Sequence, residues 1–306
     1  MQMFHVGYHT PVSGDYLKAI QHAHIDNDAT AVQIWTGNPK SYFAKKLGNT
    51  ERVKKYVEDN NLFLISHSPY ILNFARDPDI KVLNRYITDL QNINAMGGKG
   101  SVLHMGFNVK AIKKTHEEAC RTMIKNLDMV ARKTPKDSIM ILENMAGKGT
   151  AMCCKMDEWA AFSEEIPEDL YKRIGWCVDT AHLHGVGEYN LSMRREAMRF
   201  YDDFDSQIGW DRLLCFHFNG SIADLGSCKD LHADIGHDMS GVIESKGLRH
   251  LARIAWETEK PLIMEIPANT SPVAWQVATV RSWVDPNHPM HTEFGRANIV
   301  KNILNV

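Results

Sequence analysis

The stretch Ile174–His184, which reads IGWCVDTAHLH, combines a short apolar run with two polar side chains. The apolar run has the length and composition of a buried strand. It ends on Asp179, and His182 follows three residues later, so both side chains would point into the space above the carboxyl end of the strand. Carboxylate oxygen and imidazole nitrogen are the atoms that bind a zinc-like cation. A simpler interpretation is a helix N-cap, in which Asp179 or Thr180 caps the next helix and His182 has no role.

The same pattern, a short apolar run followed by a polar turn and a helical segment, recurs along the chain. The candidate strands are Phe4–His9, Thr30–Trp35, Leu62–His67, Ser101–His104, Ser138–Glu143, Ile174–Asp179, Leu213–Phe218 and Pro261–Ile266. The candidate helices are Tyr16–Ile25 after a cap at Ser13, Thr115–Lys133, Arg194–Phe204 and Leu248–Trp256. Thr115 and Glu118 have the spacing of a capping box. Strands that alternate with helices indicate right-handed βαβ units and a parallel sheet.

Eight such units predict an α/β fold of the (β/α)8 TIM barrel type, in a single domain. An open, doubly wound sheet is the alternative, but it would usually carry a glycine-rich phosphate loop after its first strand, which Gly7–His9 is not. We expect the barrel to span residues 1–285. Residues 286–306 would form a C-terminal extension that packs on the barrel or frays from it.

Composition narrows the class of protein. The 306 residues are 44% hydrophobic and 24% charged, which is ordinary for a water-soluble chain, and no apolar run approaches the roughly 20 residues of a membrane span. The N-terminus lacks the pattern of a secretion signal, and the six cysteines form no CxxC pair, so we expect a reduced, intracellular protein of the cytoplasm or the nucleoid or nucleus. The net charge of −2 gives no hint of nucleic acid, whereas 15 histidines hint at metal. We expect a monomer with no membrane partner.

Metal-ligating side chains stand at or just beyond the ends of six consecutive candidate strands. They are His67, His104, Glu143, Asp179, His182, His217, Asp230, His232 and Glu265. In a barrel these strand ends converge on one mouth, where barrel enzymes keep their active sites. Four carboxylates buried together would repel one another unless cations neutralise them. Nine nitrogen and oxygen ligands are too many for one tetrahedral ion and suit two or three, with zinc favoured over manganese or iron. Such clusters suit phosphoester hydrolysis, because they lower the pKa of bound water and hold phosphoryl oxygens.

These motifs resemble those of endonuclease IV, a family of apurinic/apyrimidinic endonucleases with a (β/α)8 barrel and three zinc ions. The resemblance runs from about Gly7 to Glu265, and its motifs are HSPYILN, LENMAG, CVDTAH, HFN and DLHADIG. It implies three Zn²⁺ per chain, with Mn²⁺ as an option at one or more sites. His67 and His104 would hold one ion, and Glu143 would bridge it to a second. Asp179, His217 and Glu265 would complete the second site. His182, Asp230 and His232 would hold the third ion.

By the same resemblance, the chain would cut double-stranded DNA on the 5′ side of an abasic site, leaving a 3′-hydroxyl and a 5′-deoxyribose phosphate. Glu143 would be the central catalytic residue, and Lys40, Tyr70 and Ile71 would contact DNA. Tyr70 and Ile71 directly follow a candidate ligand segment and should lie at the rim of the mouth, although both could instead be packed in the core. The chain departs from the family at Lys40, Met145, Gly220, Leu231 and Asp238, where Arg, Thr, Asp, Arg and Gly are usual. None of these changes removes a ligand.

A different reaction class remains as the alternative. Sugar isomerases and epimerases of the same barrel use one divalent ion, which Glu143, Asp179, His217 and Glu265 would satisfy. They have no use for the remaining ligand types as a metal-binding set. The Asp-x-His that begins at Asp230 discriminates between the two, and its presence favours the endonuclease.

Overall fold

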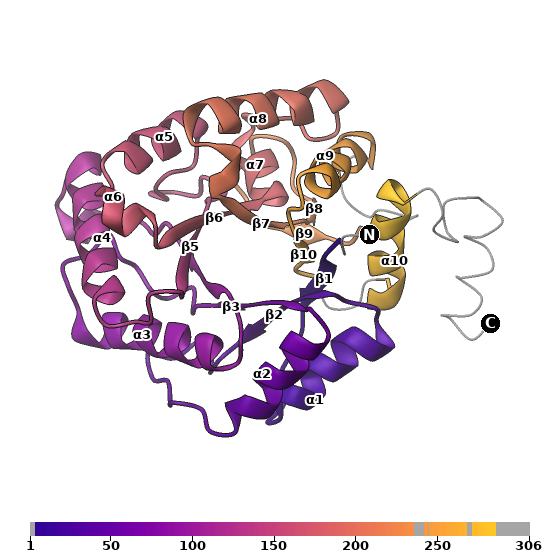
Figure 1. The fold of residues 1–306 in the computed structure, drawn as a ribbon. Helices are drawn as coiled ribbons and strands as arrows, with labels where there is room; N and C mark the ends of the chain where they lie inside the picture. Colours follow the sequence, from indigo (N-terminus) through magenta and orange to yellow (C-terminus); the bar gives the residue numbers. More distant parts are fainter. Residues whose placement is uncertain (1–3, 236–241, 244, 268–270, 286–306) are drawn as a thin grey trace.

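The computed structural model describes residues 4–235, 242–243, 245–267 and 271–285, so the predicted extension at 286–306 lies outside it. Parallel strands close into an eight-stranded barrel in the order β1-β10-β7-β6-β5-β4-β3-β2 (Figure 1). They are β1 Val6–His9, β2 Ala31–Trp35, β3 Phe63–His67, β4 Gly100–His104, β5 Ile139–Glu143, β6 Ile174–Asp179, β7 Leu213–His217 and β10 Leu262–Met264. The short strands β8 Gly220–Ser221 and β9 His232–Ala233 pair antiparallel outside the barrel. The predicted fold class is therefore confirmed.

Helices surround the barrel wall (Figure 1). They are α1 Tyr16–Gln21, α2 Thr50–Asp59, α3 Ile80–Ala95, α4 His116–Ala131, α5 Met156–Glu164, α6 Glu168–Tyr171, α7 Thr180–Val186, α8 Arg194–Gln207, α9 Ser245–Glu257 and α10 Val273–Val284. A π-helix, η1 His22–Asp26, continues α1, and the 3-10 turns are η2 Lys110–Ile112 and η3 Trp210–Arg212. No helix in the described ranges has both the length and the apolar character that a membrane crossing requires.

Helix starts follow local hydrogen-bond chemistry. The predicted capping box of α4 is present, because Thr115 Oγ1 accepts from the Glu118 amide at 3.2 Å and the Glu118 carboxylate accepts from the Thr115 amide at 2.8 Å. The predicted cap of α1 at Ser13 is wrong. Asp15 has the extended backbone of an N-cap and accepts from the Lys18 amide, so the helix begins two residues later than Ser13 would require.

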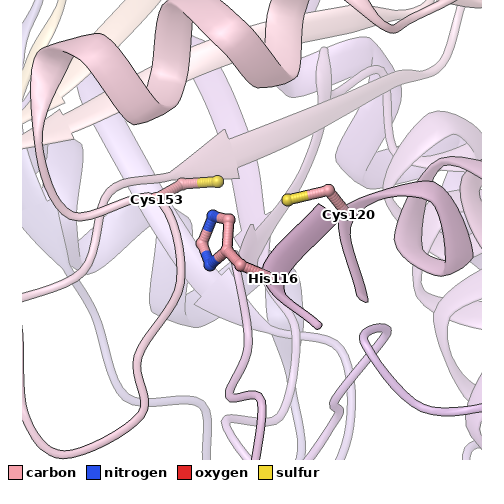
Figure 2. A group of neighbouring side chains, drawn as sticks. All are labelled: His116, Cys120 and Cys153. Carbon is pink, nitrogen blue, oxygen red and sulfur yellow. The ribbon is translucent and has the colours of Figure 1, made fainter. Parts of the chain in front are cut away.

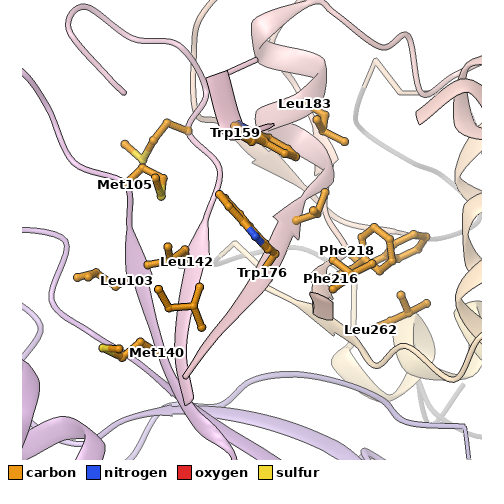
Figure 3. Packing of buried hydrophobic residues seen from close by; sticks show 14 of the residues in the cluster. Leu103, Met105, Met140, Leu142, Trp159, Trp176, Leu183, Phe216, Phe218 and Leu262 are labelled. Carbon is orange, nitrogen blue, oxygen red and sulfur yellow. The ribbon is translucent and has the colours of Figure 1, made fainter. Parts of the chain in front are cut away.

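Buried apolar residues form two groups on opposite faces of the barrel wall. The inner group fills the barrel and comprises Ala31, Phe63, Ile65, Val102, Ile141, Cys177, Cys215 and Ile263. The outer group packs between wall and helices, and Figure 3 shows Met140, Leu142 and Trp176 of the wall together with Trp159 of α5. The two indole rings stack with centroids 5.8 Å apart. Because side chains alternate along a strand, a residue two positions beyond an inner one also points inward.

Candidate metal centre

The alternation of the strands aims six predicted ligands into the barrel mouth. Each lies two residues beyond an apolar side chain of the inner group, as Glu143 lies beyond Ile141 on β5. The six are His67, His104, Glu143, Asp179, His217 and Glu265. Strand register also matches some of them in pairs across the wall, His104 with Glu143 and Asp179 with His217. The convergence that the sequence predicted is thus a consequence of strand parity and register.

Glu143 occupies the middle of this group. Its side chain is fully buried, and its Oε2 lies 3.2 Å from His67 Nε2 and 3.1 Å from His104 Nε2. Its other oxygen, Oε1, lies 2.7 Å from His217 Nδ1. The two oxygens of one carboxylate therefore face two different sets of imidazoles. That is the arrangement of a carboxylate placed to bridge two cations.

A second set of ligand types surrounds Asp230. Its Oδ1 lies 3.2 Å from His182 Nε2 and 3.1 Å from His232 Nε2. Asp179 Oδ2 lies 3.4 Å from the same nitrogen of His232. Asp179 Oδ1 accepts from the His182 amide at 2.9 Å and caps α7. The cap interpretation of Asp179 is therefore confirmed, and it leaves the other carboxylate oxygen facing the imidazole of His232.

Backbone carbonyls fix the tautomers of two imidazoles. His67 Nδ1 lies 2.6 Å from the Ser68 carbonyl, and His182 Nδ1 lies 2.8 Å from the Asn144 carbonyl. A carbonyl only accepts, so each Nδ1 carries a hydrogen, and each Nε2 is the atom that offers its lone pair to a cation when the imidazole is neutral. Metal-ligating histidines in proteins are usually oriented by partners of this kind.

Two buried amides hold the cluster in place, and the sequence reasoning assigned neither a role. Gln33 donates through Nε2 to Glu265 Oε1 at 2.9 Å, and its Oε1 lies 2.8 Å from His217 Nε2. Asn219 donates through Nδ2 to Asp179 Oδ2 at 2.7 Å and accepts from the Glu265 amide at 2.7 Å. The Glu265 amide thus bonds to a side chain, and β10 ends at Met264, two residues before the predicted end at Ile266. In the sequence, the signal that could have identified Gln33 is its polar side chain within the otherwise apolar run Ala31–Trp35.

The electrostatics of the mouth favour positive charge. Burial by itself raises the pKa of the Glu143 carboxyl, but His217 and His104 together hold that pKa well below its ordinary value. Burial lowers the pKa of His182, yet Asp179 and Asp230 outweigh it and raise that pKa to about 10. His217 behaves alike, since Glu265 and Glu143 outweigh its burial and raise its pKa to about 10. Without a cation, protons on imidazoles balance the carboxylates.

The donor atoms fit metal ions in both chemistry and spacing. Within the described part of the chain, four overlapping groups of three or four mouth residues have ligand atoms within 4.8 Å of one another. His232 Nε2 is buried and makes no hydrogen bond to any described residue, although carboxylate oxygens stand beside it. Imidazole nitrogen and carboxylate oxygen together suit zinc-type ions.

Comparisons with known proteins agree with this geometry. Residues 23–284 match the xylose isomerase-like TIM barrel family. A "probable endonuclease 4" of Mesomycoplasma hyopneumoniae is 32% identical over 275 residues, covering 86% of this chain and 89% of that protein. A "putative endonuclease 4" of Acanthamoeba polyphaga mimivirus is 28% identical over 270 residues, covering 86% and 85%.

The chain belongs to the endonuclease IV family. Among solved structures, endonuclease IV from Thermus thermophilus aligns with a TM-score of 0.76 at 22% identity, covering 91% of this chain and 98% of that one. A D-tagatose 3-epimerase-like protein aligns with a TM-score of 0.62 at 14% identity, covering 98% and 97%. These two likenesses show a shared barrel fold.

Three of the five positions where this member departs from its family, Met145, Gly220 and Leu231, lie within two residues of Glu143, Asn219 or Asp230. Gly220 is buried in β8, and a Cβ there would come within 3.1 Å of the Ala233 and Asp234 carbonyl oxygens. The absence of a side chain lets β9, which begins at His232, lie close to β8. Leu231 is exposed next to Asp230, and Met145 is buried just beyond Glu143. Asp238 lies outside the described residues.

The residues predicted to contact DNA lie in different surroundings. The side chain of Tyr70 is 46% exposed, and its ring meets Trp35 edge-on at 6.2 Å. The centroid of the Trp35 ring in turn lies 4.9 Å from that of His67. The Trp35 ring therefore separates Tyr70 from the cluster, and Tyr70 lies at the rim of the mouth. Ile71 is half-buried against the outer core, and Lys40 is exposed on the β2–α2 loop. The surface position expected of Tyr70 is present, whereas Ile71 is partly a core residue.

Proposed function

We propose that this chain is a DNA-repair endonuclease that hydrolyses the phosphodiester bond on the 5′ side of an abasic site. The products would be a 3′-hydroxyl and a 5′-deoxyribose phosphate. The observation that carries the proposal is the buried Glu143 carboxylate, which faces His67 and His104 on one side and His217 on the other. Membership of the endonuclease IV family supports the reaction class. All of these groups come from one chain, which is consistent with a monomeric enzyme.

The proposal includes three zinc ions per chain, with Mn²⁺ able to replace zinc at one or more sites. His67 and His104 would hold the first ion and share Glu143 with the second, which Asp179, His217 and Glu265 would complete. His182, Asp230 and His232 would hold the third. When bound, such ions supply Lewis-acid charge to phosphate oxygens and activate water. Gln33 and Asn219 would keep the ligand carboxylates in position throughout.

Selectivity would come from access to the mouth. The phosphates of intact duplex DNA lie on its outside, and a deep mouth cannot take in an undistorted strand. A nucleotide without a base is extruded at the least cost, since it gives up little stacking or pairing. Tyr70, exposed beside Trp35, would fill the gap that the extruded nucleotide leaves. Lys40 would contact a backbone phosphate, and Ile71 would support Tyr70 from below.

A sugar isomerase or epimerase is the second candidate. Glu143, Asp179, His217 and Glu265 have ligand atoms within 4.8 Å of one another and would suffice for its single divalent ion. That reaction leaves His182 and His232, which group with Asp179, unexplained. We therefore favour the endonuclease.

The test is incision of a labelled duplex that carries one tetrahydrofuran abasic analogue. This analogue cannot undergo β-elimination, so a cut at its 5′ side must be hydrolysis. We expect the zinc-loaded enzyme to cut there, to leave the undamaged duplex intact, and to stop when a chelator removes the metal. A zinc-loaded enzyme that leaves the analogue intact but interconverts a ketose and an aldose would establish the second candidate instead.

A further inference from the structure

A separate group of metal-ligating side chains lies outside the barrel mouth. His116 and Cys120 stand four residues apart in α4 and therefore share one face of the helix. Cys153 comes from the loop between β5 and α5. One ligand atom from each of the three lies within 4.8 Å of the other two. Figure 2 shows both sulfur atoms pointing toward one another, with the imidazole of His116 beside the gap between them.

We propose that His116, Cys120 and Cys153 form a binding site for one zinc-type cation, distinct from the cluster in the barrel mouth. Two thiolates and an imidazole are a preferred donor set for zinc. With Zn–S bonds of about 2.3 Å, the two sulfurs of a tetrahedral site stand roughly 3.7 Å apart. The ligand atoms, which lie within 4.8 Å of one another, would need to move by no more than about 1 Å to reach that value. Water would take the fourth position, because the side of the site at His116 is open to solvent.

The surroundings of the two sulfurs fit this role. Cys120 and Cys153 are both buried, at 6% and 0% exposure, and their sulfurs lie within 4.8 Å of each other. A buried pair of thiols beside one exposed imidazole gives a cation a short path from solvent to soft ligands.

The backbone of Cys153 provides an independent observation. Its φ of +51° lies in the left-handed region, which non-glycine residues rarely adopt. The Trp159 indole holds this conformation by donating to the Cys153 carbonyl oxygen at 2.6 Å. The conformation turns the Cys153 sulfur toward α4, as Figure 2 shows. Strain of this kind concentrates at functional sites.

The other cysteines of the described chain do not form such a site. Cys177 and Cys215 are register partners on β6 and β7, but they lie in the barrel interior and belong to none of the ligand groups found among the described residues. Cys154, the neighbour of Cys153, points its sulfur at the Ala151 carbonyl oxygen, 3.4 Å away. An ion at the proposed site would tie the loop that follows Glu143 to α4. It would thereby hold one wall of the mouth without entering it.

Cobalt substitution of the full chain under reducing conditions tests the site. Thiolate bound to Co²⁺ absorbs strongly in the near ultraviolet, whereas the nitrogen and oxygen ligands of the barrel mouth do not. We expect this absorption in the wild type, its loss in Cys120→Ser and Cys153→Ser, and its retention in the matched control Cys154→Ser. Zinc analysis should give one ion per chain fewer for Cys120→Ser than for Cys154→Ser.

If a cysteine variant fails to fold, a variant of the exposed residue His116 provides a second test. His116→Ala changes a surface side chain, and we expect it to weaken or shift the absorption while the protein stays folded. Incision at the tetrahydrofuran analogue should persist in Cys120→Ser, so this site and the proposed function can fail separately. Absorption that is missing from the wild type, or that survives in both Cys120→Ser and Cys153→Ser, would overturn the proposal. A Cys120–Cys153 disulfide that persists under reduction would do the same.

Discussion

The carboxylate of Glu143 contacts imidazoles on both sides of the mouth. Glu143→Gln keeps its shape but removes its charge, so two cations would face each other without a shared anion. We expect kcat on the tetrahydrofuran duplex to fall at least ~10³-fold, which is a barrier increase of about 4 kcal/mol. The exposed α2 residue Glu51, changed to Gln, serves as the control and should retain full turnover. A raised KM with unchanged kcat would show that Glu143 is not central.

Gln33 acts on the cluster through hydrogen bonds to His217 and Glu265. Gln33→Leu keeps similar volume but frees both ligands to turn away from the mouth. Loss of such a partner typically costs 10- to 100-fold in metal affinity, and we expect a loss of about this size when zinc is titrated against a competing chelator. Gln91→Leu, on the outer surface of α3, should bind zinc like the wild type. Unchanged affinity in Gln33→Leu would assign Gln33 to packing alone.

Tyr70 and Lys40 should affect DNA binding without affecting metal. Both are exposed, so Tyr70→Ala and Lys40→Ala should change the free energy of unfolding by no more than about 0.5 kcal/mol. Each should weaken binding to the damaged duplex. Only Lys40→Ala should lower the slope of log affinity against log salt, by about 0.9, because its ammonium displaces one counterion.

Lys172→Ala is the matched control for this pair, since Lys172 lies two residues before the start of β6 and so at the opposite end of the barrel. It should leave the salt slope unchanged. If Tyr70→Ala lowers the unfolding free energy by several kcal/mol, Tyr70 is a core residue and does not act as a wedge.

At the level of elements, the strands and their polar ends were predictable, whereas their hydrogen-bond partners were not. Short apolar runs identified all eight barrel strands, because buried parallel strands are apolar on both faces. The role of Gln33 could not be read in the same way, since its partner Glu265 lies 232 positions away and meets it only when the barrel closes. Cys153 and His116 come from neighbouring units of the barrel, but no local sequence pattern pairs them either. Local patterns predict elements, and closure determines which side chains meet.

Closure of the barrel depends on Gly7, where β1 meets β2. A Cβ at Gly7 would lie 1.7 Å from the Ala31 carbonyl oxygen, and Ala31 is its register partner. Gly7→Ala must therefore separate the two strands, and we expect it to cost more than about 4 kcal/mol of unfolding free energy in urea titration. Gly48→Ala is the control, because a Cβ there meets nothing within 4 Å. Equal urea midpoints for the two variants would contradict this account of the barrel wall.

For the whole molecule, metal binding and folding are linked, because the ligands come from strands that are far apart in sequence. Ions that bind only the folded barrel stabilise it by mass action. Without ions, protons on the imidazoles partly neutralise the carboxylates and so stabilise the folded barrel. The pKa values of His182 and His217 are each about 10 in the fold, against about 6.5 in an unfolded chain.

The metal-free protein should therefore lose stability as the solution becomes alkaline. Because both folded pKa values are raised, the stabilising contribution is complete below about pH 6.5 and disappears as the pH rises through about 10. Each imidazole can contribute up to about 1.4 kcal/mol per pH unit within that window. In the zinc-loaded protein the ions replace these protons, and deprotonated imidazoles bind them better, so stability should hold or increase over the same range. Urea midpoints measured with and without chelator across this window should diverge with rising pH. If the chelated protein kept a constant midpoint, the protons on these two imidazoles would not be what holds the empty mouth together.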